Sequence, residues 1–298
     1  MSIDLEFIDD VGRFIGHAGD WMSKDPVRNT VIADVSHSWA QQPPALPAGK
    51  NRVPLWWLVV RDGDGAVAGA GMRTVWVPPY PIYLAAMPAG AGEFLAETLH
   101  RREERVEVAN GFLRPVSEFA ERTAALHGMS ARPVMQPRLF EARSITGPPR
   151  PGGSLRTASR DDLQLYRHWY ESFTIAADAQ AGRRQETTHF VPPEDELGHH
   201  IDRGRVHFWC DPAGSPVSLV CISAPSHGVC RIGPVYTPDS LRGNGYAGAA
   251  VAELSSSVLA RGHRVCLYVD QANPVSNELY ERLGYRFVDD TVSMVIEA

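Results

Sequence analysis

The sequence of 298 residues has no basic excess, no long apolar segment and no cysteine motif. Its formal net charge is −6, whereas a nucleic-acid-binding domain carries clustered Lys and Arg, so nucleic acid is not an expected partner. The longest apolar run, VPLWWLVV at residues 53–60, is far shorter than the roughly 20 residues of a membrane-spanning helix. The N-terminus, MSIDLEFIDD, has acids where a secretory signal is basic. These absences predict a cytoplasmic protein without a membrane partner.

The cysteines are few and do not have the spacing of a metal or disulfide framework. None of the four belongs to a C-x-x-C pair, and no histidine pattern accompanies them, as a zinc site would require. They stand in apolar runs that are typical of strands. We therefore expect reduced thiols in the core, and no metal site, for Cys210, Cys221, Cys230 and Cys266.

The chain divides at a segment rich in proline and glycine, TGPPRPGGS at residues 146–154. Such a segment supports neither helix nor strand and is typical of a linker, so we predict two domains, residues 1–147 and 154–298. After the linker, strand patterns dominate and helices are inserted at intervals, which indicates an α+β (mixed α/β) fold. YRFVDD and TVSMVIEA, which end the sequence, are expected to be two separate final strands.

The first half resembles a weaker copy of the second. Its hairpin pattern at residues 56–74 matches the later hairpin pattern at 206–223, and PIYLAAMP matches the strand that precedes a glycine-rich loop. The copy has no arginine or glutamine leading that loop, and Phe119-Ala120 stand where the second half has Tyr280. We predict a duplicated fold in which only the second copy kept its site.

The glycine-rich loop of the second half, LRGNGYAGAAVAEL, has the spacing G-x-G-x-x-G. Dinucleotide-binding folds use this spacing, and Asp270 stands where an acid would hold a ribose. However, TPDSLR separates the preceding strand from the glycines, and Arg242 comes directly before them. Only 28 residues (298 − 270) follow Asp270, too few for the further strand–helix units of a doubly wound sheet. A dinucleotide-dependent oxidoreductase is therefore the weaker alternative.

The same loop fits a second pattern, [RQ]-x-x-G-x-[GA], at Arg242–Ala247. Consecutive N–H groups at a helix N-terminus form a nest that binds a diphosphate without a metal. Downstream, NPVSNELYERLGYRF has the spacing N-x6-Y-x3-G-[YF]. Together these motifs resemble the GNAT superfamily of acyl-CoA-dependent N-acetyltransferases, from about Leu155 to the C-terminus. The resemblance implies two GNAT-like domains, a degenerate copy and an acetyl-CoA-binding copy, each a central, mostly antiparallel sheet flanked by helices.

The resemblance also implies a site. The strand before the loop would pair with the pantetheine arm, the loop would hold the diphosphate, and two asparagines would contact the pantetheine arm and the thioester. Tyr280 would be the general acid for the leaving thiol, or alternatively an anchor that packs its helix on the sheet. The implied cofactor-binding residues are Val235, Tyr236, Thr237, Arg242, Gly243, Asn244, Gly245, Tyr246, Ala247, Gly248, Asn273 and Asn277.

The implied activity is transfer of an acetyl group from acetyl-CoA to a primary amine of a small-molecule acceptor, by direct attack in a ternary complex. A non-catalytic acyl-CoA-binding or sensor module is the alternative. The acceptor, the monomeric or homodimeric state and the general base are left open. The polar segment Asp178–Phe190 is expected to border the acceptor. The residues considered for the base are His227, Cys230, Arg231, Glu171 and Asp178, besides water.

Overall fold

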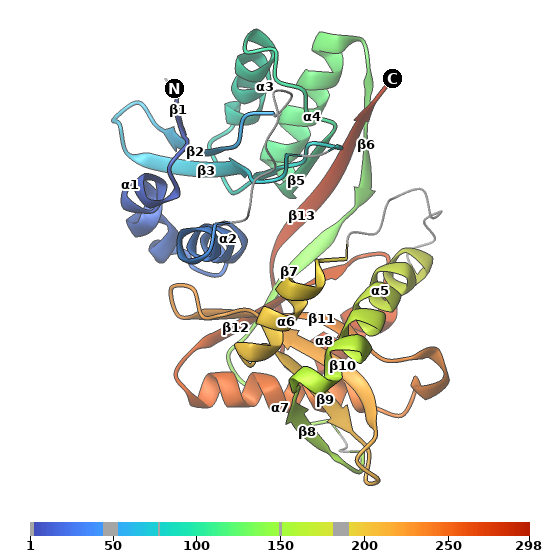
Figure 1. Cartoon of the computed structure of the whole chain (residues 1–298). Coiled ribbons are helices and arrows are strands. Elements are labelled where there is room, and N and C mark those ends of the chain that lie inside the picture. The colour runs from blue at the N-terminus through green and yellow to red at the C-terminus, as the bar shows by residue number, and fades with distance from the viewer. Residues whose placement is uncertain (1–2, 44–52, 77, 149–150, 181–190) are drawn as a thin grey trace. The chain divides into compact units, whose positions relative to one another are not determined.

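The computed structural model forms two compact units (Figure 1). Unit 1 comprises Met1–Arg138 and Asp289–Ala298, and unit 2 comprises Leu139–Val288. Each unit has its own sheet, and each sheet has helices on both faces. The mixed α/β fold predicted from the sequence is confirmed. The residues that the structure describes are 3–43, 53–76, 78–148, 151–180 and 191–298.

Unit 1 has the strand order β1-β2-β3-β4-β5-β13, and β6 pairs with β13. β4 and β5 run parallel, whereas the other paired strands of this unit are antiparallel. In chain order the elements are β1 (Asp4–Ile8), α1 (Val11–Lys24), α2 (Thr30–Gln41), β2 (Trp56–Arg61), β3 (Val67–Arg73), β4 (Ile82–Leu84), α3 (Ala91–Arg101), β5 (Val108–Phe112), α4 (Leu113–His127), β6 (Ser130–Met135) and β13 (Arg286–Glu297).

Alternating side chains of β2 explain how unit 1 buries both faces of its sheet. Successive residues of a strand point to opposite faces. Trp56, Leu58 and Val60 belong to the core cluster that α3 and α4 cover, whereas Trp57 and Val59 belong to the cluster that α1 and α2 cover. The sheet therefore lies between two pairs of helices, which is the arrangement visible in Figure 1.

Unit 2 repeats this plan with the strand order β13-β7-β12-β11-β10-β9-β8, in which β11 and β12 are parallel. α7 and α8 cover one face of the sheet, and α5 and α6 cover the other. The elements are β7 (Pro137–Ala142), β8 (Ser154–Thr157), α5 (Leu163–Gln180), α6 (Glu194–Asp202), β9 (Val206–Cys210), β10 (Pro216–Ile222), β11 (Val229–Tyr236), α7 (Tyr246–Ala260), β12 (Arg264–Asp270) and α8 (Pro274–Arg282).

The two units exchange strands. β13 begins in unit 2 and ends in unit 1, where Thr291–Val295 pair with β5. Its residues Val292, Met294 and Ile296 are buried in the core of unit 1. β7 runs the opposite way, because it begins in unit 1 and places Phe140 in the core of unit 2. The compact units therefore differ from the predicted domains, residues 1–147 and 154–298, since a boundary at the linker ignores the exchange.

The end of the chain is one strand, not the two predicted at YRFVDD and TVSMVIEA. Adjacent acids, Asp289 and Asp290, lie at the boundary between the two predicted strands. Arg28 Nε donates to Asp289 Oδ2 at 2.8 Å, and Arg138 Nε lies 3.6 Å from Asp290 Oδ1. Two arginines thus balance the acids, so the strand continues through them.

Three smaller expectations concern cysteines, membranes and metals. All four cysteines are free and buried, as predicted. No helix in the described part of the chain has the length and apolar character needed to cross a membrane. Among the described residues, His, Cys, Asp and Glu side chains form no group of three or more that could hold a metal ion.

Candidate functional site

The parallel strands β11 and β12 separate at one end. Their pairing runs from Val229↔Arg264 to Ile232↔Leu267 and stops there, although β11 continues to Tyr236 and β12 to Asp270. Beyond this point β11 stays paired with β10 through Val220↔Val235 and Leu219↔Tyr236. The β11 edge that faces β12 is therefore open, and its backbone can pair with an extended ligand.

The glycine-rich loop leads from the open end of β11 into α7. Gly243 has φ +81° and Gly245 has φ +80°, a backbone conformation that glycine adopts readily and other residues avoid. Gly245 is the N-cap of α7 and provides no side-chain cap. Within the described part of the chain, the amides of residues 243–248 have no hydrogen-bond acceptor. The loop and the helix dipole thus have the geometry of a nest that can hold an anion.

Two side chains brace this loop. Arg242 Nε donates to the carbonyl of Thr237 at 3.1 Å, and Arg242 Nη2 forms a salt bridge of 2.7 Å with Asp239. Asn244 Nδ2 donates to the carbonyl of Leu241 at 3.0 Å. Arg242 and Asn244 therefore use their side chains to fix the loop, while the amides that follow stay available.

The start of α8 is tied to the end of β12. Asn273 is the N-cap of α8 and accepts a hydrogen bond from the amide of Ser276 at 3.1 Å. Asn277 Nδ2 donates to the carbonyls of Asp270 at 2.8 Å and Asn273 at 2.7 Å, and its Oδ1 is buried without a partner among the described residues. The Asn277 amide group thus holds α8 against β12, and only Oδ1 is left to accept a further donor. Asp270 braces the turn by accepting a hydrogen bond from the amide of Ala272 at 3.1 Å.

Tyr280 lies inside the core cluster of the α7 and α8 face and is 8% exposed. This cluster also contains Val269 of β12 and, at its margin, Val235 of β11, so Tyr280 belongs to the same core as both strands of the open pair. Burial raises the pKa of Tyr280 to about 12. Within the described part of the chain the hydroxyl has no hydrogen-bond partner. Tyr280 is therefore a protonated donor at neutral pH.

The residues considered for a general base lie elsewhere or engage other groups. His227 stands in the turn before β11 with φ +45°, at the end of the strand opposite to the gap. Cys230 is buried in the core cluster under α7, and Glu171 is exposed on α5. The side chain of Asp178 and residues 181–190 of the predicted acceptor segment lie outside the described residues.

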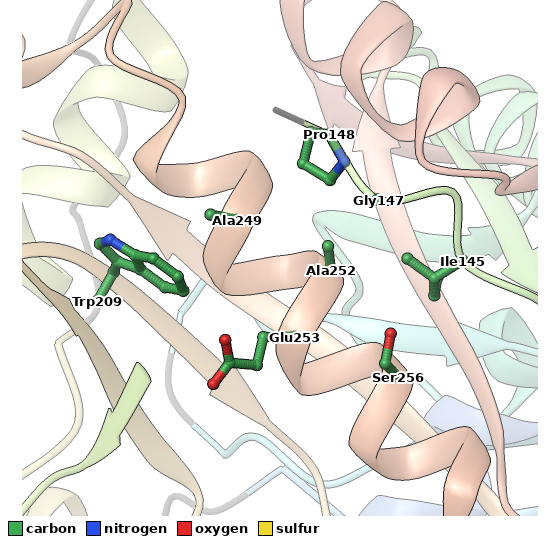
Figure 2. A pocket seen from close by; sticks show the side chains of 8 residues that line it. All are labelled: Ile145, Gly147, Pro148, Trp209, Ala249, Ala252, Glu253 and Ser256. Atoms are coloured by element: carbon green, nitrogen blue, oxygen red, sulfur yellow. The ribbon is translucent and has the colours of Figure 1, made fainter. Parts of the chain in front are cut away.

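A pocket of about 390 Å³ lies beside α7 (Figure 2). The α7 residues that line it begin at Ala249, after the glycine-rich loop. Figure 2 shows Trp209 on one side of the helix and Ile145 and Pro148 on the other. None of the residues predicted for the site lines it. Its lining residues are Ile145, Gly147, Pro148, Trp209, Ala249, Ala252, Glu253 and Ser256. The candidate site is thus the gap and the loop, not this pocket.

Comparisons with known proteins agree with this geometry. Residues 220–294, which span the open strands, the loop and α8, match the family model described as FR47-like protein. Whole-chain fold similarity extends to a GCN5-related N-acetyltransferase from Sphaerobacter thermophilus, with 17% sequence identity, TM-score 0.57 and coverage of 98% of this chain and 94% of that chain. A search of curated proteins found no match.

Two further solved structures cover both units. A tandem GNAT protein from the clavulanic acid biosynthesis pathway has 16% identity and TM-score 0.54, covering 99% of this chain and 98% of that one. A Drosophila protein known from its X-ray structure has 14% identity and TM-score 0.63, covering 100% and 99%. The resemblance to the GNAT superfamily found in the sequence is confirmed by the family-model match over residues 220–294 and by the shared fold. This fold supports acyl-CoA-dependent acetyl transfer in general.

Proposed function

We propose that unit 2 is an N-acetyltransferase that transfers the acetyl group of acetyl-CoA to a primary amine of a small molecule, by direct attack in a ternary complex. The observation that carries this proposal is the combination of an open strand pair with a loop of unpaired amides at its end. Neither feature serves the stability of the fold, since exposed strand edges and uncapped helix termini leave polar groups unsatisfied.

The gap and the loop match the two halves of the cosubstrate. The open edge of β11, from Val235 to Thr237, would hydrogen-bond the extended pantetheine arm as an added strand does. The amides of residues 243–248 would surround the diphosphate, with the dipole of α7 favouring its charge. Asn277 Oδ1, buried and without a described partner, fits an amide N–H of the arm. When bound, acetyl-CoA supplies an activated carbonyl and a thiol leaving group.

Tyr280 provides the proton that the leaving thiol needs. A free thiol has a pKa of about 8.5, so a thiolate leaves more readily when a donor stabilises it. Burial holds the pKa of Tyr280 at about 12, which keeps the hydroxyl protonated over the whole neutral range. Proton donation by a positioned side chain contributes roughly 10²–10⁴-fold to a rate. The proposal assigns this role to Tyr280 and assigns no protein group as the base.

Binding and turnover measurements test the proposal together. Calorimetry with coenzyme A and with NADH reports which cofactor binds, and release of free thiol from acetyl-CoA across a panel of small amines reports transfer. We expect coenzyme A binding and amine-dependent thiol release. Binding without amine-dependent release would support the non-catalytic acyl-CoA module, and binding of NADH but not coenzyme A would support the dinucleotide alternative.

A further inference from the structure

Unit 1 contains a carboxylate at the N-terminus of its own α3. Glu118 Oε2, from α4, accepts hydrogen bonds from the amides of Gly90 at 3.1 Å and Gly92 at 3.2 Å. Gly90 is the N-cap of α3 and has no side chain to cap these amides itself. A carboxylate at this position satisfies both donors and interacts favourably with the positive end of the helix dipole.

α3 in unit 1 and α7 in unit 2 occupy equivalent places in the element order of their units. In each unit a helix connects two parallel strands, α3 between β4 and β5 and α7 between β11 and β12. The caps of these helices have nearly the same backbone, with φ +81° at Gly90 and φ +80° at Gly245. The helix that follows the second strand packs beside the cap in both units, as α4 and as α8.

The residues of α4 and α8 can be matched by counting from the first residue of each helix. Glu118 is the sixth residue of α4 counted from Leu113, and Leu279 is the sixth residue of α8 counted from Pro274. A Cβ on Gly92 would lie 2.8 Å from Glu118 Cβ, and a Cβ on Gly248 would lie 3.1 Å from Leu279 Cδ1. Both side chains therefore lie against the first turn of the preceding helix, at its second residue in unit 1 and at its third residue in unit 2. One carries a negative charge, and the other is apolar.

The strands of unit 1 also lack the gap of unit 2. β4 and β5 pair up to Leu84↔Gly111, and β4 ends at Leu84. A Cβ on Gly111 would lie 1.9 Å from the carbonyl oxygen of Leu84, so the two backbones are in direct contact where an arm would have to enter. The seventh residue of α4 is Phe119, which has no hydroxyl, whereas the seventh of α8 is Tyr280.

We propose that the carboxylate of Glu118 occupies, in unit 1, the position that unit 2 keeps free for the diphosphate of an acyl-CoA. Unit 1 thus carries its own anion, excludes the cofactor, and leaves the chain with a single acyl-CoA site. The inference rests on the proposed function only in assigning the diphosphate to residues 243–248. The anion site at α3 is a property of unit 1 alone, and removing Glu118 exposes it to a free anion.

Amide resonances of the glycines test this with inorganic pyrophosphate as the probe. In the wild-type chain we expect pyrophosphate to shift the resonances of Gly243 and Gly245 and to leave those of Gly90 and Gly92 in place. In Glu118→Ala all four are expected to shift. Glu121→Ala, an exposed acid one turn further along α4, is the control and is expected to behave as the wild type.

The outcomes separate the two proposals. Shifts at Gly90 and Gly92 in Glu118→Ala, without shifts at Gly243 and Gly245, would support the anion site of unit 1 and count against the proposed diphosphate site. The inference would be overturned if pyrophosphate left the Gly90 and Gly92 resonances unchanged in a folded Glu118→Ala chain. Two coenzyme A sites per wild-type chain in calorimetry would also overturn it.

A second variant covers the case in which the alanine variant does not fold. Glu118→Gln keeps the shape of the side chain and removes its charge, so we expect the amides of Gly90 and Gly92 to exchange with solvent at least tenfold faster than in the wild type. Equal exchange rates in Glu118→Gln and the wild type would contradict a charge-dependent role for Glu118.

Discussion

The rings of Tyr280 and Tyr285 meet edge to face, with centroids 5.9 Å apart and an interplanar angle of 66°. Their hydroxyls differ in surroundings. The Tyr285 hydroxyl lies 2.7 Å from Ser255 Oγ, a buried hydrogen bond, whereas the Tyr280 hydroxyl has no partner among the described residues. Two neighbouring tyrosines of one core thus differ, because the hydroxyl of Tyr285 is hydrogen-bonded and that of Tyr280 is not, within the described part of the chain.

Replacing Tyr280 with phenylalanine is expected to reduce turnover by about 10²–10⁴-fold, because the proton donor is lost. Coenzyme A affinity and thermal stability are expected to change little, since the ring and its packing remain. Tyr285→Phe is the matched control, and loss of its bond to Ser255 should cost about 1 kcal/mol of stability without the loss of turnover. Thiol-release kinetics and thermal melting measure both. An unchanged turnover number in Tyr280→Phe would refute the assignment.

Replacing Gly245 with alanine is expected to weaken coenzyme A binding at least tenfold. The residue adopts φ +80°, and an alanine there costs roughly 1–2 kcal/mol and tilts the amides of the nest. Gly262→Ala provides the comparison, since Gly262 has φ +79° and lies beyond the other end of α7. Both variants should lose similar stability in urea, but only Gly245→Ala should lose affinity in calorimetry. Equal affinity losses would place the cofactor elsewhere.

Replacing Met294 with alanine is expected to destabilise unit 1, although the residue lies near the C-terminus. Met294 is 5% exposed in the core of unit 1, and such truncations cost about 2–5 kcal/mol. Amide exchange should therefore accelerate in β5 and leave β9 unchanged. The comparison variant, Leu267→Ala, removes a side chain from the core of unit 2 and should show the opposite pattern. Faster exchange in β9 alone after Met294→Ala would contradict the strand exchange.

Acid is expected to destabilise unit 2 through His207. Burial lowers the pKa of His207 to about 4, whereas a histidine in the unfolded chain has a pKa of about 6.5. Between these values the unfolded state binds more protons than the folded state, so the free energy of unfolding falls as the pH falls from 6.5 to 4.

Urea titrations at pH 7 and pH 4.5 measure this dependence. His207→Leu should lose less stability between the two pH values than the wild type, since its side chain cannot titrate. The slopes of the unfolding free energy against pH should differ by the equivalent of at most one bound proton. His168→Leu, which changes an exposed histidine of α5, is the control. A pH dependence in His207→Leu equal to that of the wild type would exclude His207 as the source.

Local chemistry could be predicted from the sequence, whereas long-range pairing could not. The glycine-rich loop at the start of α7 and the short helix after β12 depend on residues within a few positions of each other, so the motifs predict them, although Asn273 caps that helix and was expected to contact the pantetheine arm. The partner of β13 depends on Val108–Phe112, nearly two hundred residues earlier in the chain, and alternating hydrophobicity does not specify which sheet a strand joins. The continuity of β13 through Asp289 and Asp290 could not be predicted either, because the arginines that balance these acids are distant in sequence.

Glu118 could not be identified from the sequence. Phe119-Ala120 stand where the second half has Tyr280, and the shared letters E-x-x-E-R place Glu118 opposite Glu278, so an acid there does not stand out. Counting from the first residues of α4 and α8 instead matches Glu118 with Leu279. Only the contacts with Gly90 and Gly92 single out Glu118.

The reciprocal placement of β7 and β13 bears on how such a chain evolves. A cut in the DNA at the Pro- and Gly-rich linker would leave an N-terminal product that carries β7 without the sheet it joins and has lost β13. The C-terminal product would lack β7 and have an unpartnered end of β13. Gene shortening at the linker therefore cannot remove unit 1 while sparing unit 2. Each half of the sequence encodes a strand that the other half needs, so the two units are expected to be inherited together.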